Sequence, residues 1–140
     1  MKSYVIDASV VAKWFRPEEH REFALKLLGD EYELHAPDFS RLELDSLLCK
    51  WIRRGLITLA DGREIRARFR LYPVKFYSLW PLTDQAFAVA NRARCSFYDG
   101  LYLALAMSLN FPAVTADRRL YNVLKTGDYS KHVLWIEEAE

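Results

Sequence analysis

The stretch SYVIDASVVAKWF, residues 3–15, decides the fold of this chain because a strand, an acid and a helix follow one another in it without a break. Tyr4, Val5 and Ile6 predict a buried strand, and residues 9–15 predict a helix. The strand stops on a carboxylate, Asp7. An acid at the mouth of a buried strand is unusual, because a carboxylate loses hydration there. Asp7 is therefore the first candidate for a functional residue.

The composition predicts one compact domain spanning residues 1–140. Its hydrophobic content of 51% is far above that of disordered chains. No apolar run approaches the ~18 residues of a membrane span, and the first residues lack a signal-peptide pattern. We therefore expect a cytoplasmic protein without membrane contact. A net charge of +1 means that any nucleic-acid-binding surface must be local.

The cysteines and histidines do not predict a metal centre. Cys49 and Cys95 both fall in predicted helices, and two free, buried thiols are expected, although one disulfide remains open. The three histidines are scattered without ligand spacing, which argues against a zinc site.

Short apolar strands alternate with helical segments along the chain. The strands are expected near 3–6, 33–36, 76–80, 112–115 and 133–136. The helices are expected near 9–15, 18–28, 38–54, 59–71, 84–95, 97–109 and 118–125. Pro17, C′ glycines at Gly29 and Gly55, and a capping box from Thr58 to Asp61 mark helix ends. This alternation predicts an α/β fold with a parallel sheet and helices on both faces. Sites in such sheets form outside the carboxyl ends of the strands.

Four acids have positions that suit such a site. Asp7 ends the first strand, Asp117 follows the fourth, Asp99 begins an apolar helix, and Glu43 lies at the margin of a buried helical stripe. Each also has a simpler explanation. Asp7 and Asp117 could be N-caps, Asp99 could form a capping box with Ser96, and Glu43 could pair with an arginine.

The four acids together favour a metal-dependent reaction. Clustered carboxylates repel one another and must share protons or bind a hard cation. Oxygen ligands without softer donors fit Mg²⁺ or Mn²⁺. A cation of this kind activates water and neutralises charge on phosphorus, so phosphodiester hydrolysis is the predicted chemistry.

Four motifs carry a resemblance to the PIN-domain family, and within it to the VapC-type toxins of toxin–antitoxin pairs. They are VIDASVVAKWF with Asp7, APDFSRLELDSLL with Glu43, SFYDGLYLALA with Asp99, and AVTADRRL with Asp117. The resemblance runs from Ser3 to about Ile136. It implies a three-layer α/β/α sandwich with strand order 3-2-1-4-5.

The resemblance also implies a function and its residues. The acidic quartet would bind one or two Mg²⁺ or Mn²⁺ ions, and Ser9 and Thr115 would orient carboxylates or water. The activity would be endoribonucleolytic, leaving a 5′-phosphate and a 3′-hydroxyl. The partners implied are RNA, a second copy in a homodimer, and a small VapB-like antitoxin that crosses the active-site groove.

Two departures from the family pattern stand out. Gly100 replaces the usual alanine after Asp99, which should cost helix stability without changing ligand chemistry. Asp45 and Ser46 replace a small residue and an asparagine after Glu43. The Ser46 hydroxyl could take over part of the asparagine's role, and Asp45 is expected to be a solvated charge.

Arg118, Lys50 and Arg54 are the predicted RNA-binding residues, with Arg118 nearest the scissile phosphate. Arginines 63, 66 and 70 share a helix face that suits phosphate tracking or is simply solvated. Tyr98 and Tyr102 could be core or stacking platforms. Trp14, Phe15 and Trp51 could line a groove for the antitoxin or belong to the core.

Three classes of function remain open from the sequence. They are a toxin-type ribonuclease, a PIN nuclease of housekeeping RNA processing, and a catalytically silent PIN-fold binding module. An intact acidic quartet argues against the third. Neighbouring genes, rather than this sequence, would separate the first two.

Overall fold

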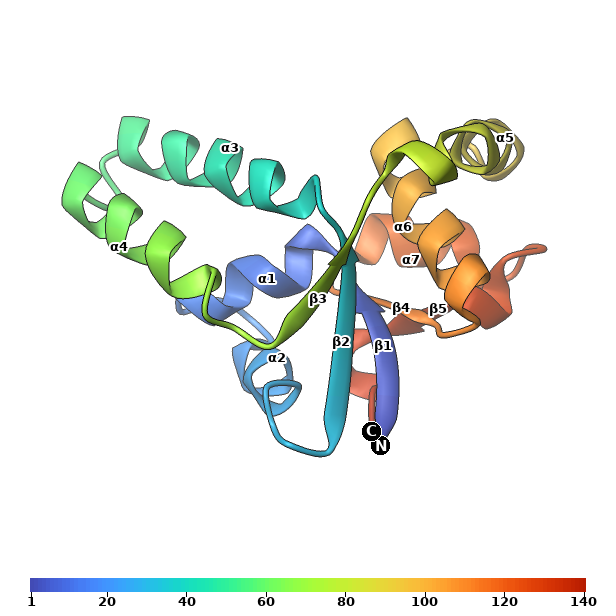
Figure 1. Ribbon diagram of the computed structural model, residues 1–140, viewed down its shortest axis with the longest axis horizontal. Helices are drawn as coiled ribbons and strands as arrows, with labels where there is room; N and C mark the ends of the chain where they lie inside the picture. The colour runs from blue at the N-terminus through green and yellow to red at the C-terminus, as the bar shows by residue number, and fades with distance from the viewer.

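The computed structural model describes residues 1–140 and is built on a five-stranded parallel sheet in the order β3-β2-β1-β4-β5 (Figure 1). The strands are β1 Lys2–Ile6, β2 Tyr32–Pro37, β3 Val74–Tyr77, β4 Ala113–Thr115 and β5 Val133–Trp135. The fold class and strand order predicted from the sequence are confirmed.

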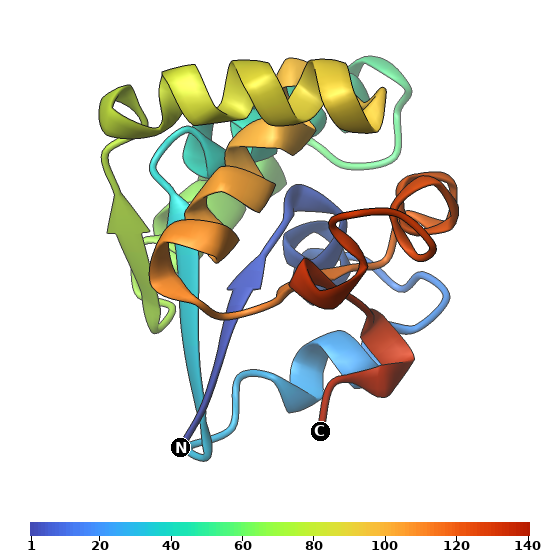
Figure 2. The same ribbon diagram turned by 90° about the vertical axis from the view of Figure 1, so that its right-hand side faces the viewer.

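Helices cover both faces of the sheet (Figures 1 and 2). The second half of β1 and all of β4 are therefore buried, whereas the edge strand β3 is only partly buried. The α-helices are α1 Ala8–Phe15, α2 Arg21–Lys26, α3 Ser40–Arg53, α4 Leu59–Phe69, α5 Thr83–Ala93, α6 Phe97–Leu109 and α7 Arg118–Leu124. Three short 3-10 helices are η1 Trp80–Leu82, η2 Ser130–His132 and η3 Ile136–Glu138. In Figure 1, α1 to α4 lie on one side of the sheet and α5 and α6 on the other.

The alternation of side chains along β1 explains this three-layer arrangement. Tyr4 and Ile6 belong to the core under α1 to α4, whereas Val5 belongs to the core under α5 and α6. Successive strand residues point to opposite faces, so a strand covered on both sides must be apolar throughout. Trp14 and Trp51 are also buried in the first core, and Phe15 packs against it. These aromatic residues are therefore core rather than a groove for a partner.

Several predicted boundaries are corrected by the structure. The third strand, predicted at 76–80, spans Val74–Tyr77, because Pro81 lies in η1, where the chain turns away from the sheet. The second helix is shorter than predicted, since it begins after His20, which has a left-handed φ of 67°. Gly55 ends α3 with a φ of 70°, as predicted, but Gly29 does not adopt this conformation. The capping box of Thr58 and Asp61 is present.

Both cysteines are free, but their environments differ from the prediction of two buried, helical thiols. Cys49 is exposed on α3, because the buried stripe of that helix runs through Leu44, Leu48 and Trp51 and leaves position 49 facing outward. Cys95 is half-buried in the connection between α5 and α6.

The strand order positions the candidate site. The chain moves outward from β1 through β2 to β3, and then returns to place β4 on the other side of β1. The carboxyl ends of β1 and β4 therefore meet at the topological switch point, where parallel sheets form their binding crevices. None of the helices combines the length and the apolar character that a membrane-spanning helix requires.

Candidate active site

Asp7 follows β1 directly and caps the N-terminus of α1. Its Oδ1 accepts hydrogen bonds from the backbone N–H groups of Ser9, at 3.0 Å, and Val10, at 3.3 Å, and from the Ser9 hydroxyl. The residue is only 6% exposed. The capping role considered from the sequence is therefore real, but all three bonds use one oxygen, and Oδ2 takes none of them.

Two hydroxyl groups link Asp7 to the segment that carries Asp117. The Ser9 Oγ accepts a hydrogen bond from the Ala116 N–H at 2.9 Å, and lies 3.4 Å from the Thr115 Oγ1. Thr115 in turn accepts a hydrogen bond from the Asp117 N–H at 3.0 Å. These contacts fix the ends of β1 and β4 relative to each other. Ser9 thus contacts the Asp7 carboxylate, and Thr115 contacts the backbone of Asp117.

Glu43 lies in the first turn of α3 and is held by a residue of α6. The Tyr102 hydroxyl donates a hydrogen bond of 2.7 Å to Glu43 Oε1, and Tyr102 itself is 3% exposed. Tyr102 thus belongs to the core and also fixes a site carboxylate. Ser46 lines the same cavity as Glu43, but no hydrogen bond joins them, so Tyr102 provides the support hypothesised for Ser46.

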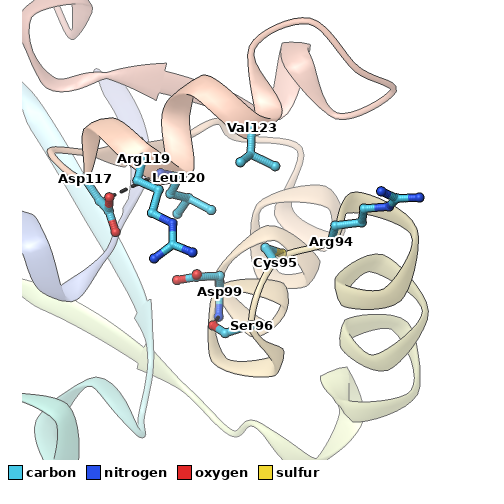
Figure 3. Close-up of a pocket in the computed structure, with 8 residues that line it drawn as sticks. All are labelled: Arg94, Cys95, Ser96, Asp99, Asp117, Arg119, Leu120 and Val123. Carbon is cyan, nitrogen blue, oxygen red and sulfur yellow. Dashed lines mark hydrogen bonds between the residues drawn. The ribbon is translucent and has the colours of Figure 1, made fainter.

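Asp99 and Asp117 line one side of a cavity of about 230 Å³ between α6 and α7 (Figure 3). Asp117 caps α7 by accepting a hydrogen bond from the Leu120 N–H at 3.2 Å. Asp99 lies in the first turn of α6, where its N–H donates to the Ser96 hydroxyl at 3.0 Å. The Ser96 cap considered from the sequence is present, and the Asp99 carboxylate points into the cavity in Figure 3.

The four carboxylates interact electrostatically with one another. Burial is the largest cause that raises the pKa of Asp7 from 3.8 to about 6. Burial also raises the pKa of Glu43 and of Asp99. Negative charge adds to each shift: Asp99 acts on Asp7, Asp7 and Asp99 act on Glu43, and Asp117 acts on Asp99. Four acids from distant parts of the sequence therefore form one mutually repelling group.

The donor chemistry of this group fits a hard divalent cation. The four acids offer carboxylate oxygens as ligands, although the Cys95 thiol also lines the cavity of Asp99 and Asp117. In Asp7, Glu43 and Asp117 the hydrogen bonds to the carboxylate occupy a single oxygen. The second oxygen of each is available as a ligand. No three His, Cys, Asp or Glu side chains lie close enough together to form a preformed metal site. A cation would have to draw the carboxylates closer.

The predicted RNA-binding residues have different surroundings. The Arg118 guanidinium lies over the Trp135 ring, 3.8 Å from its centroid, whereas Arg119 lines the cavity with Asp99 and Asp117. Lys50 lines a second cavity, of about 350 Å³, with Ser9 and Glu43. Arg54 is exposed at the end of α3 and lines neither cavity.

One arginine of α4 is already engaged in an ion pair within the protein. Arg66 forms a bidentate ion pair with Asp45, with N–O distances of 2.6 and 3.0 Å. Asp45 is therefore paired rather than freely solvated, because α4 packs alongside α3 and brings Arg66 within reach.

The sequence draws attention to Tyr102 and to the pair Arg118 and Arg119, but it does not predict that Tyr102 binds Glu43 or that Arg119, rather than Arg118, lines the cavity. Tyr102 lies three positions after Asp99, so it shares a helix face with that acid, and this spacing was the available signal. Arg119 had no such signal, because two adjacent arginines at the start of a helix point in different directions that only packing decides.

Comparisons with known proteins agree with this geometry. Residues 4–125 match the model of the PIN domain. Ribonuclease VapC3 of Pyrobaculum aerophilum is 31% identical over 118 residues, which cover 83% of this chain and 90% of that protein. Ribonuclease VapC9 of Mycobacterium tuberculosis is 37% identical over 97 residues, which cover 69% of this chain and 74% of that protein.

Solved structures share the fold. The crystal structure of PAE2754 from Pyrobaculum aerophilum matches with a TM-score of 0.72 and 24% identity, over 97% of this chain and 85% of that one. VapBC2 from Rickettsia felis, bound to a DNA fragment from its promoter, matches with a TM-score of 0.66 and 11% identity, over 95% and 98% of the two chains. These matches agree with the strand order and with the four acids at the carboxyl ends of the strands. The chain belongs to the PIN-domain family, and the curated relatives it matches are VapC ribonucleases.

Proposed function

We propose that this protein is a Mg²⁺- or Mn²⁺-dependent endoribonuclease and the toxin of a toxin–antitoxin pair. The observation that carries the proposal is the meeting of Asp7, Glu43, Asp99 and Asp117 at the carboxyl edge of the sheet, with raised pKa values for the first three. Such a group is costly unless a cation neutralises it. The similarity to VapC ribonucleases supports RNA as the substrate.

Each side chain then has a defined task. Asp7, oriented by Ser9, and Glu43, oriented by Tyr102, present carboxylate oxygens from the two sides of the site. Asp99 and Asp117 do so from the cavity between α6 and α7. A bound divalent cation would supply a water of lowered pKa and offset charge on the phosphate. The half-buried Ser9 hydroxyl and the buried Thr115 hydroxyl keep the carboxylates fixed without adding charge.

The partners follow from the relatives. Solved structures with this fold include a toxin–antitoxin complex from Klebsiella pneumoniae and FitAB bound to DNA. We propose a small antitoxin as the partner of this chain, and we extend the proposal to a homodimer. We also propose a cytoplasmic location, because that is where the proposed RNA substrate occurs. A housekeeping nuclease would have the same site, and an antitoxin that co-purifies with the chain and blocks cleavage separates the two.

The test is RNA cleavage by the purified protein, freed of any partner, with Mn²⁺ or with EDTA. We expect cleavage only with the metal, with 5′-phosphate and 3′-hydroxyl ends on the products. Asp99→Asn should lower the rate by at least ~100-fold, since it removes a charged ligand from the site. Asp30→Asn is the matched control, because Asp30 is exposed in the turn before β2.

Two outcomes contradict the proposal. Cleavage that survives in EDTA would exclude the metal-dependent reaction. Metal-dependent cleavage by Asp99→Asn at the wild-type rate would exclude the assigned site. Structured and unstructured RNA should both be offered, because a nuclease of narrow specificity cuts only one kind.

A further inference from the structure

The cavity between α6 and α7 contains two arginines without an acidic partner. Arg119, from α7, and Arg94, from the end of α5, line it together with Asp99 and Asp117 (Figure 3). Both arginines are exposed, and neither takes part in any ion pair of the structure. Figure 3 shows the Arg119 side chain directed toward the acids and the Arg94 side chain directed away from them, so both charges are available to an anion from outside but lie apart.

Arg119 is placed beside the acids. In Figure 3 its guanidinium group extends into the space between Asp117 and Asp99. Its neighbour Arg118 is held over the Trp135 ring on another side of α7. Packing therefore holds Arg118 against Trp135 and leaves Arg119 at the cavity. A guanidinium group binds phosphate oxygens through two parallel N–H groups, which suits this position.

Arg94 has a backbone conformation that is unfavourable for an arginine. It ends α5 with a φ of 60° and a ψ of 42°, in the left-handed region. A residue with a Cβ atom pays about 1 kcal/mol there, and glycine or asparagine is the usual choice. At the corresponding end of α6 the residue is Asn110, with a φ of 60°. An arginine kept in this conformation suggests a use for its side chain.

A second basic wall lies on the other side of the acids. Lys50 and Arg53 of α3 line the cavity that also contains Ser9 and Glu43. The four carboxylates therefore lie between positive groups on α3 and positive groups at the α5 end and α7. The acids repel an isolated anion. For a polyanionic strand that contacts both basic walls, the attraction to the lysine and arginines outweighs the repulsion by the acids.

We propose that Arg94 and Arg119 form a phosphate-binding subsite for single-stranded RNA, which holds the strand next to the phosphate that is cut. The inference rests on the proposed function, because it names how the substrate of that site is held. Arg119 contacts a phosphate close to the acids, and Arg94 contacts one further along the strand. Both are binding residues, and neither takes part in the bond cleavage.

The test measures binding of a short, mixed-sequence, fluorescein-labelled single-stranded RNA in EDTA, by anisotropy at several salt concentrations. Each phosphate contact to a single strand contributes about 0.7 to the slope of log K against log salt concentration. The slope is negative, and Arg119→Gln and Arg94→Gly should each reduce its magnitude by about that amount. Arg94→Gly also relieves the left-handed backbone, so it should fold at least as well as the wild type. Lys26→Gln, an exposed change of the same charge on α2, should leave the slope unchanged.

The outcomes separate this inference from the proposed function. If the wild type binds and cleaves RNA but both variants keep its slope, the subsite is wrong and the nuclease stands. If Lys26→Gln reduces the magnitude of the slope as much as Arg119→Gln, the cavity is not the binding site. Binding with the expected slopes, without cleavage in Mn²⁺, would support the subsite and contradict the nuclease. A wild-type protein that binds no RNA would overturn both.

Discussion

A single residue can serve the fold and the site together, as Asp7 shows. One carboxylate oxygen caps α1, and burial of the carboxyl group raises its pKa to about 6. From the sequence, an N-cap and a metal ligand were alternative explanations. The structure shows that they are compatible, because a carboxylate has two oxygens. The same holds for Asp117 at the start of α7.

Asp7 predicts an unusual dependence of stability on pH. Folding raises its pKa from 3.8 to about 6, so the folded protein holds this proton more tightly than the unfolded chain. Without metal, stability should therefore fall as the pH rises from about 4 to 6, by up to about 3 kcal/mol. Asp7→Asn keeps an oxygen for the cap and removes the charge. In EDTA at neutral pH it should unfold at a higher urea concentration than the wild type, and a lower midpoint would contradict this account.

Tyr102 should tune the activity through Glu43. Its hydrogen bond lowers the pKa of Glu43 against the effect of burial. Tyr102→Phe removes this bond, so the pKa of Glu43 should rise and the acidic limb of kcat/KM should move to higher pH. Tyr98→Phe is the control, since the Tyr98 hydroxyl makes no hydrogen bond. An unshifted limb in Tyr102→Phe would show that Glu43 does not need to be ionised.

Among the elements, α6 is the one that packing constrains most. Its residues from Gly100 to Ala106 are all buried, and it lies between the sheet and α5. A Cβ atom at Gly100 would lie 2.6 Å from the Ala86 carbonyl oxygen of α5. The glycine that departs from the family pattern is therefore required by this close approach. It lets α5 pack closely against the start of α6, the helix that carries Asp99.

Gly100→Ala should therefore destabilise the protein, although alanine is the better helix former. The expected loss is about 1–3 kcal/mol, because backbone rather than a mobile side chain must move. Gly62→Ala on α4 is the matched control. Its Cβ would meet only the flexible end of Ile52, at 3.0 Å, so it should be neutral or stabilising. Thermal unfolding of both variants checks the difference, and equal melting temperatures would contradict it.

The sequence predicted elements better than their contacts. Buried strands such as residues 4–6 and the Thr58 capping box have local signals, and these predictions are confirmed. No local signal marks the end of β3 or the direction of the Arg119 side chain, because both depend on which segments pack beside them. The lack of space for a side chain at Gly100 is likewise a property of α5 and α6 together, not of either helix alone.

At the scale of the whole molecule, the site exists only in the folded chain. Its four acids come from β1, α3, α6 and the end of β4, and nothing but the sheet order brings them together. Three of the acids could be selected from the sequence because they stand at element boundaries, and Glu43 because it lies at the margin of a buried helical stripe. Their mutual distances could not, since those depend on how α3 and α6 lean against the sheet.

A cation that binds only this assembly should stabilise the whole fold. At a concentration 100 times its Kd, the gain is about 2.7 kcal/mol. For a chain of this size that corresponds to a rise in Tm on the order of 10 °C. Mn²⁺ should produce this rise in the wild type, and Asp99→Asn should reduce it. The measurement is a thermal shift with and without EDTA, and an equal rise in both proteins would argue against Asp99 as a ligand.

The return of the chain to place β4 beside β1 also has a consequence for biosynthesis. β1, β2 and β3 leave the ribosome first, and they carry only Asp7 and the segment of Glu43. Asp99 and Asp117 emerge later, and the sheet can close around them only when β4 pairs with β1. On the proposed function, a growing chain is therefore harmless to its own messenger RNA. The order of the strands delays the nuclease until translation is almost finished.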